Sequence, residues 1–95
     1  MRDVAAAVEE HLGVIVVDGQ RCEMWVRSEP DDEGTWHNAM MFRRSGGRAS
    51  AHEVLVTGLE WHVPPGRALE RARTLDENEQ AALFRRALQP RSPLI

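Results

Sequence analysis

The chain has 95 residues, a formal net charge of −3 at pH 7 and 42% hydrophobic residues, which fits one globular domain with a modest core and no room for a deeply enclosed active site. The acidic balance disfavours a general nucleic-acid binder, which normally carries a basic excess. All twelve basic residues are Arg and no Tyr occurs, so a lysine Schiff base, a P-loop lysine and a tyrosine acid or base are excluded.

Residues 2–12 predict a short amino-terminal helix. This segment, RDVAAAVEEHL, is rich in alanine, and Val4, Val8 and Leu12 recur at four-residue spacing, which gives a narrow apolar stripe. Gly13 stands where helices commonly end. We therefore expect the chain to begin with a helix that buries little area.

The dipeptide Asp18-Gly19 predicts a tight β-hairpin, because both residues of such a turn must tolerate positive φ. The β-branched segment 14–17 precedes it. A two-residue turn pairs Ile15 with Cys22, and this register decides which side chains share a face.

Three further strands are expected at about 21–28, 35–43 and 52–58, each with apolar residues at alternate positions or in short β-branched runs. The acidic segment EPDDEG at 29–34 predicts a polar turn, and the segment RSGGRAS at 44–50 predicts a flexible loop. These strands predict an antiparallel meander.

A charge pair suggests the register of the last strand. Glu53 opposite Arg43 is a favourable cross-strand pair. That register puts Val54 and Val56 on the core face and Leu55 on the other face.

Two prolines, Pro64 and Pro65, end the sheet because neither can donate to a strand ladder. A short helical segment follows at 67–73. A second helix is expected to open at Thr74, where TLDE matches a Thr-x-x-Glu capping box with Glu77. Its apolar stripe consists of Leu83, Phe84, Ala87 and Leu88.

Together these elements predict a small α+β domain over residues 1–89, followed by a flexible tail at 90–95. The expected architecture is a four-stranded antiparallel meander with a short amino-terminal helix and a capped carboxy-terminal helix packed on one face. The order is helix, four strands, helix.

Metal or nucleophilic chemistry has little support in the sequence. His11, His37, His52, His62 and Cys22 are scattered and lack the paired spacing that presets metal ligands, so no metal or other cofactor is expected. Cys22 falls within a strand, with no helix amino terminus after it to lower its pKa. His37 is the only general base that we would name if the protein were an enzyme.

The dipeptide Trp-His occurs twice, as Trp36-His37 and Trp61-His62. Adjacent strand residues point to opposite faces, so Trp36 is expected in the core and His37 on the other face. Trp61 is expected to fill the end of the sheet. We interpret the repetition as coincidence.

One face of the predicted sheet mixes apolar and charged side chains. The opposite face is plainly a core, with Ile15, Cys22, Met24, Val26, Trp36, Met40 and Phe42. The mixed face carries Val14, Val16, Arg21, Glu23, Trp25, Arg27, His37, Met41, Arg43 and Leu55.

The mixed face predicts a non-enzymatic protein–protein interaction module, either a homodimer or an accessory subunit. Trp, Met and Arg are enriched at interfaces, and an apolar centre with a charged rim is the usual anatomy. The expected partner-binding residues are Arg21, Trp25, Arg27, His37, Met41 and Arg43.

Three alternatives stay open for this face. A helix or the WHVPPG segment could cover its apolar part, with the arginines reaching outward. Single-stranded nucleic acid could stack on Trp25 with Arg21, Arg27 and Arg43 on phosphates, although the net charge disfavours it. A small enzyme using His37 is the third.

The composition also predicts a location. The single Cys22 suits a reducing compartment, and no apolar run approaches the ~20 residues that span a bilayer or resembles a signal-peptide core. We therefore expect a cytoplasmic protein without a membrane contact. Few residues with AT-rich codons occur, which indicates a GC-rich bacterial genome.

Overall fold

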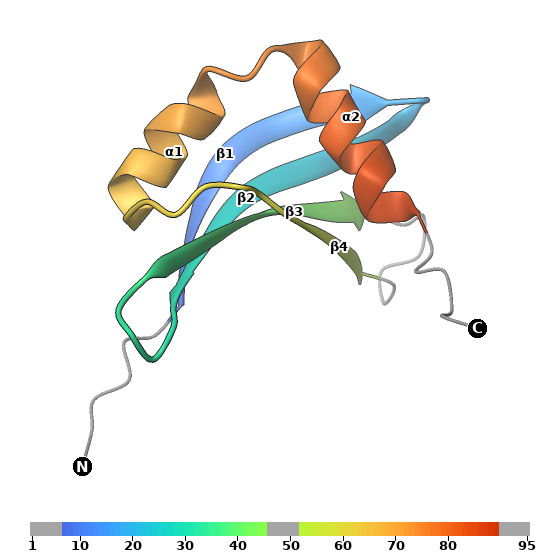
Figure 1. Cartoon of the computed structure of the whole chain (residues 1–95). Helices are drawn as coiled ribbons and strands as arrows, with labels where there is room; N and C mark the ends of the chain where they lie inside the picture. Colours follow the sequence, from blue (N-terminus) through green and yellow to red (C-terminus); the bar gives the residue numbers. More distant parts are fainter. Residues whose placement is uncertain (1–6, 46–51, 90–95) are drawn as a thin grey trace.

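The computed structural model describes residues 7–45 and 52–89, which form a four-stranded antiparallel sheet with two helices on one of its faces (Figure 1). The strands lie side by side in chain order. The elements are β1 (Val8–Val17), β2 (Gln20–Pro30), β3 (Trp36–Ser45), β4 (His52–Gly58), α1 (Pro65–Arg73) and α2 (Glu77–Leu88). The expected α+β class and antiparallel meander are confirmed. Both helices follow the sheet, so the order is four strands and then two helices.

The amino-terminal helix expected over 2–12 is wrong where the structure describes that segment. Residues 8–12 belong to β1, and residues 1–6 lie outside the described part of the chain. β2 is 11 residues long, and its backbone groups pair with β1 from Val8 opposite Ser28 onward. This pairing outweighs the local helix propensity of the segment. Gly13 follows an irregularity in the β1–β2 register instead of ending a helix.

The hairpin at Asp18-Gly19 is confirmed. Asp18 has φ 50° and Gly19 has φ 78°, the positive values that a two-residue hairpin turn requires at both positions. Ile15 lies opposite Cys22, as expected. Both side chains are buried on the same face of the sheet.

The register expected for β4 is wrong by one residue. Arg43 lies opposite Val54, and Glu53 lies opposite Arg44. Because side chains alternate along a strand, this single step moves each one to the other face. Leu55, opposite Phe42, is therefore on the core face, and Val56, opposite Met41, is on the other.

The core lies between the helices and the face of the sheet that they cover. α1 contacts β1 and β2, whereas α2 contacts β4 and β1. The rings of Phe42 and Phe84 meet edge to face at 5.3 Å between centroids, and Ala68 and Ala72 let α1 approach the sheet closely. The buried apolar residues are Ile15, Val17, Cys22, Met24, Val26, Met40, Phe42, Ala68, Ala72 and Phe84.

The second helix begins two residues later than the sequence suggested. Asp76, and not Thr74, is its N-cap: the Asp76 carboxylate accepts from the Glu79 backbone N–H at 2.7 Å, and the Glu79 carboxylate accepts from the Asp76 N–H. Thr74 instead ends α1, where its hydroxyl donates to the Arg71 carbonyl at 2.7 Å. Asp is as good an N-cap as Thr or better, and Asp76 with Glu79 has the spacing of a capping box two residues further along the chain.

A buried amide anchors the segment between β4 and α1 to the sheet. Asn38, which is only 4% exposed, donates to the Ser28 hydroxyl at 2.8 Å and to the Val63 carbonyl at 3.1 Å. Its side-chain oxygen accepts from the Val63 N–H, also at 3.1 Å. The chain therefore crosses the core face of β3 before α1 begins, as Figure 1 shows.

Replacing this amide should weaken the whole fold. Asn38→Ala leaves the Val63 N–H and C=O without their partner, and we expect a loss of about 2–3 kcal/mol in the free energy of unfolding, measured by urea titration. Ser28→Ala is the control: Asn38 keeps its bonds to Val63, so the loss should be about 1 kcal/mol. Equal losses for the two variants would contradict the role given to Asn38.

Candidate interaction surface

The face of the sheet opposite the helices is the candidate site, and we call it the open face. Register and burial put it on alternate residues of each strand, while the intervening residues enter the core. Neither α1 nor α2 lies against it. Its members are Glu9, His11, Val14, Val16, Arg21, Glu23, Trp25, Arg27, Glu29, His37, Ala39, Met41, Arg43, Val54 and Val56.

Four valines make the open face apolar at both edges of the sheet. Val16 is 65% exposed, Val56 53%, and Val14 and Val54 43% each. They account for four of the six large exposed hydrophobic residues in the described part of the chain. Such a concentration on one face is typical of a contact surface.

Trp25 lies at the centre of the open face and is half-buried by its neighbours. The His11 ring of β1 meets it edge to face at 4.9 Å, and the Arg43 guanidinium lies over it at 5.9 Å from the ring centroid. Met41 is its cross-strand neighbour on β3. The indole N–H is covered and has no acceptor among the described residues. An aromatic side chain held in place this way is a rigid contact point.

The charges of the open face balance. Arg27 forms an ion pair with Glu9 of β1 and lies 3.9 Å from the Glu29 carboxylate. Glu23 lies opposite Arg43 across the β2–β3 ladder. The face therefore carries three Glu and three Arg, and Arg27 and Arg43 have carboxylates nearby, so it does not form a basic track.

The structure brings most of the expected partner-binding residues together. Trp25 and Met41 are direct neighbours, with Arg27 and Arg43 beside them, whereas Arg21 lies opposite Val16 near the hairpin turn. Leu55 is on the core face. The sequence analysis missed six members of the open face. Glu9 and His11 had been assigned to a helix, Glu29 to a turn and the two valines of β4 to the core face, and Ala39 had been left out.

A second polar group lies at the end of the sheet beside the β2–β3 turn. His37 Nε2 and Asp31 Oδ2 are 2.8 Å apart, and Asp31 Oδ1 accepts from the N–H groups of Glu33 and Thr35. The hydrogen bond from His37, followed by that from Thr35, lowers the pKa of Asp31 below its ordinary value of 3.8. The carboxylate thus fixes both the turn and the His37 ring.

The two Trp-His pairs, interpreted above as coincidence, meet at this end of the sheet. The rings of His37 and His62 are in edge contact, with centroids 5.1 Å apart. His62 Nδ1 donates to the Trp36 carbonyl at 3.1 Å. This contact fastens the segment after β4 to the start of β3.

Neither metal binding nor nucleophilic catalysis gains support from this geometry. Within 7–45 and 52–89, no group of three or more His, Cys, Asp or Glu side chains could hold a metal ion. Cys22 is fully buried, and burial raises the pKa of its thiol. Asp31 could orient His37 as a proton acceptor, but both side chains are exposed at the end of the sheet.

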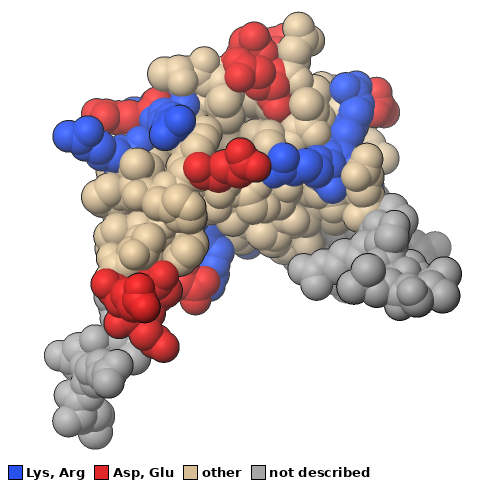
Figure 2. Space-filling model, viewed as in Figure 1, with Lys and Arg blue, Asp and Glu red and all other residues tan. Residues whose placement is uncertain are grey.

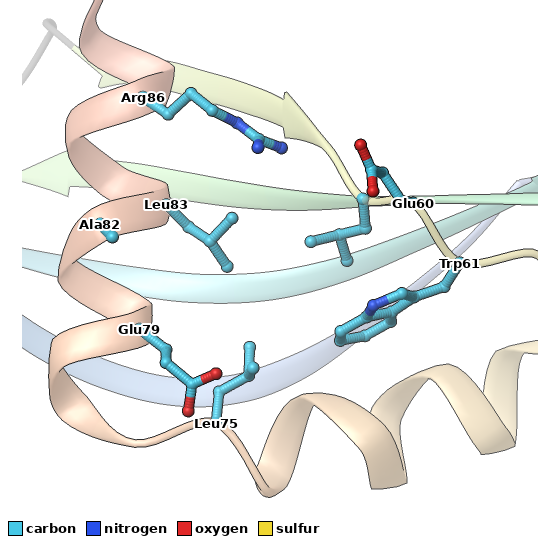
Figure 3. A pocket seen from close by; sticks show the side chains of 8 residues that line it. Glu60, Trp61, Leu75, Glu79, Ala82, Leu83 and Arg86 are labelled. Atoms are coloured by element: carbon cyan, nitrogen blue, oxygen red, sulfur yellow. The ribbon is translucent and has the colours of Figure 1, made fainter.

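A groove between α2 and the segment after β4 is one of several concave features of the described residues (Figure 3). It has a volume of about 410 Å³. Two of its three charged residues have structural partners: Arg86 bonds the Thr57 hydroxyl at 2.9 Å and the Gly58 carbonyl, and Glu79 completes the α2 cap. The hydrogen bonds of Arg86 therefore hold α2 against β4. Its lining is Leu59, Glu60, Trp61, Leu75, Glu79, Ala82, Leu83 and Arg86.

The charge pattern over the helices gives no second candidate. Figure 2 views the molecule as in Figure 1 and shows acidic and basic residues interspersed on that side, with acidic residues gathered at the β2–β3 turn at lower left. Over the described residues visible there, no continuous basic surface forms.

The protonation of the Asp31 carboxylate should be detectable in solution at low pH. A lowered pKa means that the carboxylate stays ionised, and keeps its hydrogen bonds, until the pH falls below 3.8. The amide proton signals of Glu33 and Thr35, followed by NMR, should therefore shift with a midpoint below pH 3.8. The transition should vanish in Asp31→Asn. A midpoint above 3.8 in the wild type would contradict the proposed bonding.

Comparisons with known proteins give no further guide. No protein-family model, curated protein or solved structure matches the chain. None of the helices in the described part of the chain is both long enough and apolar enough to cross a membrane.

Proposed function

We propose that this protein is a non-enzymatic protein–protein interaction module and that the open face is its interface. One observation carries the proposal: the sheet has an apolar face, centred on Trp25 and Met41, that neither helix covers. Trp, Met and Arg, which this face carries beside its exposed valines, are enriched at interfaces. The first candidate for the partner is a second copy of this chain.

The size of the open face fits such a role. With strands about 4.8 Å apart and about 3.3 Å per residue, four strands of about nine residues give a face of roughly 600 Å². Stable interfaces bury about 600–1,000 Å² on each partner. The face is thus at the lower end of what a stable complex needs.

The alternative of single-stranded nucleic acid has less support. Backbone recognition needs arginines that are available to phosphates, whereas Arg27 is paired with Glu9 and Glu29. Stacking would rest on Trp25, which is already half-buried between neighbours.

We also propose a cytoplasmic location, because the one cysteine of the chain is a free, buried thiol.

Substitutions that charge the open face should dissociate the assembly. We expect the wild type to have about twice the 10.7 kDa mass of one chain, and Val56→Asp and Met41→Asp to have the mass of one. An isolated carboxylate in an apolar contact has to be desolvated without a partner. Light scattering after size exclusion measures the masses, and circular dichroism verifies the fold.

Leu88→Asp is the matched control, because Leu88 is 38% exposed on α2, away from the open face. Its mass should equal that of the wild type. A monomeric wild type, or an assembly that survives both open-face variants, would overturn the proposal.

A further inference from the structure

We infer that a second copy of this chain covers the open face, with the twofold axis of the dimer running between β2 and β3 and parallel to both strands. This inference rests on the proposed function and adds which residues meet. The axis follows from how the side chains of the two central strands are paired.

Cross-strand neighbours on the open face are chemically complementary. Glu23 lies opposite Arg43, Trp25 opposite Met41, and Glu29 opposite His37. The pairs are an acid with a base, an aromatic ring with a thioether, and an acid with an imidazole. The fourth pair sets Arg27, already bonded to Glu9, opposite the small Ala39.

A twofold axis between β2 and β3 turns each of these pairs into an intermolecular contact. The operation lays β2 of one copy over β3 of the other, so each side chain meets its own cross-strand partner again. Glu23 faces Arg43 of the other copy, and Trp25 faces Met41, twice each in a symmetric dimer. Glu23 and Arg43 of each copy then face a side chain of opposite charge on the other copy.

An axis at right angles to the strands is less favourable. Passing through the row of Trp25, it lays each strand over itself. Glu23 then faces Arg27 of the other copy, but Arg43 comes over Ala39. Burying a guanidinium without a facing carboxylate is costly. This arrangement also lays Met41 over Met41 and Trp25 over Trp25. The parallel axis also lays an arginine, Arg27, over Ala39 of the other copy. Arg27 keeps its ion pair with Glu9, whereas Arg43 forms no ion pair within the described part of the chain.

The charge balance of the open face also favours a second copy. Its three Glu and three Arg leave no net charge from these residues, so two identical faces do not repel each other. A strongly basic or acidic partner would find no complementary field. Two sheets packed face to face about 10 Å apart keep their strands within about 30° of each other, so central residues stay in register.

Thiol cross-linking at the sheet edges tests the axis. Val14 and Val54 lie in the same row, on β1 and β4, and each is 43% exposed. With the proposed axis Val14 of one copy faces Val54 of the other. Val14→Cys and Val54→Cys chains are therefore co-expressed and treated with a short bismaleimide. The mixture should yield a cross-linked dimer, and each variant alone should yield little.

The wild type is the control, since its one thiol, Cys22, is buried on the core face. If Val54→Cys cross-links with itself as well as in the mixture, β4 lies over β4 and the inferred axis is wrong. In that case an intact dimer that Val56→Asp still dissociates would leave the proposed function standing. A monomeric wild type would overturn both.

Charge reversal tests the same axis without a cross-linker. Arg43→Glu puts two carboxylates face to face at each copy of the Glu23 contact, and we expect the dimer dissociation constant to rise by about tenfold or more. Mixing this variant with Glu23→Arg should restore the wild-type mass. If Arg43→Glu alone leaves the dissociation constant unchanged, Arg43 faces no carboxylate and the axis is wrong.

Discussion

The side-chain amide of Asn38 joins three parts of the molecule that are far apart in the sequence. It bonds β2 through Ser28 and the segment after β4 through both backbone groups of Val63, while its own backbone belongs to β3. A buried amide of this kind is favourable only when its donors and acceptor are satisfied, and here they are. Because this anchor leads the chain across one face of the sheet, both helices are placed on that face.

The open face exists because the chain after β4 crosses the sheet only once. α1 and α2 both contribute apolar residues to the same core, with Phe84 against Phe42. With both helices on one side, the valines of the opposite side have no cover within the described residues. The proposed interface is thus a consequence of topology: the residues that make it apolar are ordinary strand formers. What distinguishes them is that no helix of this chain packs on them.

The sequence predicts the central part of this fold well and its margins poorly. The turn at Asp18-Gly19 determines the β1–β2 register by local rules, and the alternation of β2 and β3 assigns their faces correctly. β4 offers no such guide, because Val54, Leu55 and Val56 are all apolar and six residues, not a two-residue turn, separate the strand from β3. The amino-terminal segment favours a helix locally, but strand pairing with β2 is a long-range effect. The contact of His37 with His62 depends on the path fixed by Asn38, so no pattern in the sequence could have indicated it.

The position of α2 also bears on how this chain folds. The four strands are neighbours in chain order, so each β-ladder can form after closing a single loop. α2 instead reaches both edges of the sheet: Arg86 bonds Thr57 on β4, and Arg85 pairs with Asp18 beside β1, 67 residues away. Docking of this helix therefore requires that all four strands are already aligned. A chain in which β4 has slipped by one residue would offer α2 the wrong face, so docking of this helix would select the correct sheet.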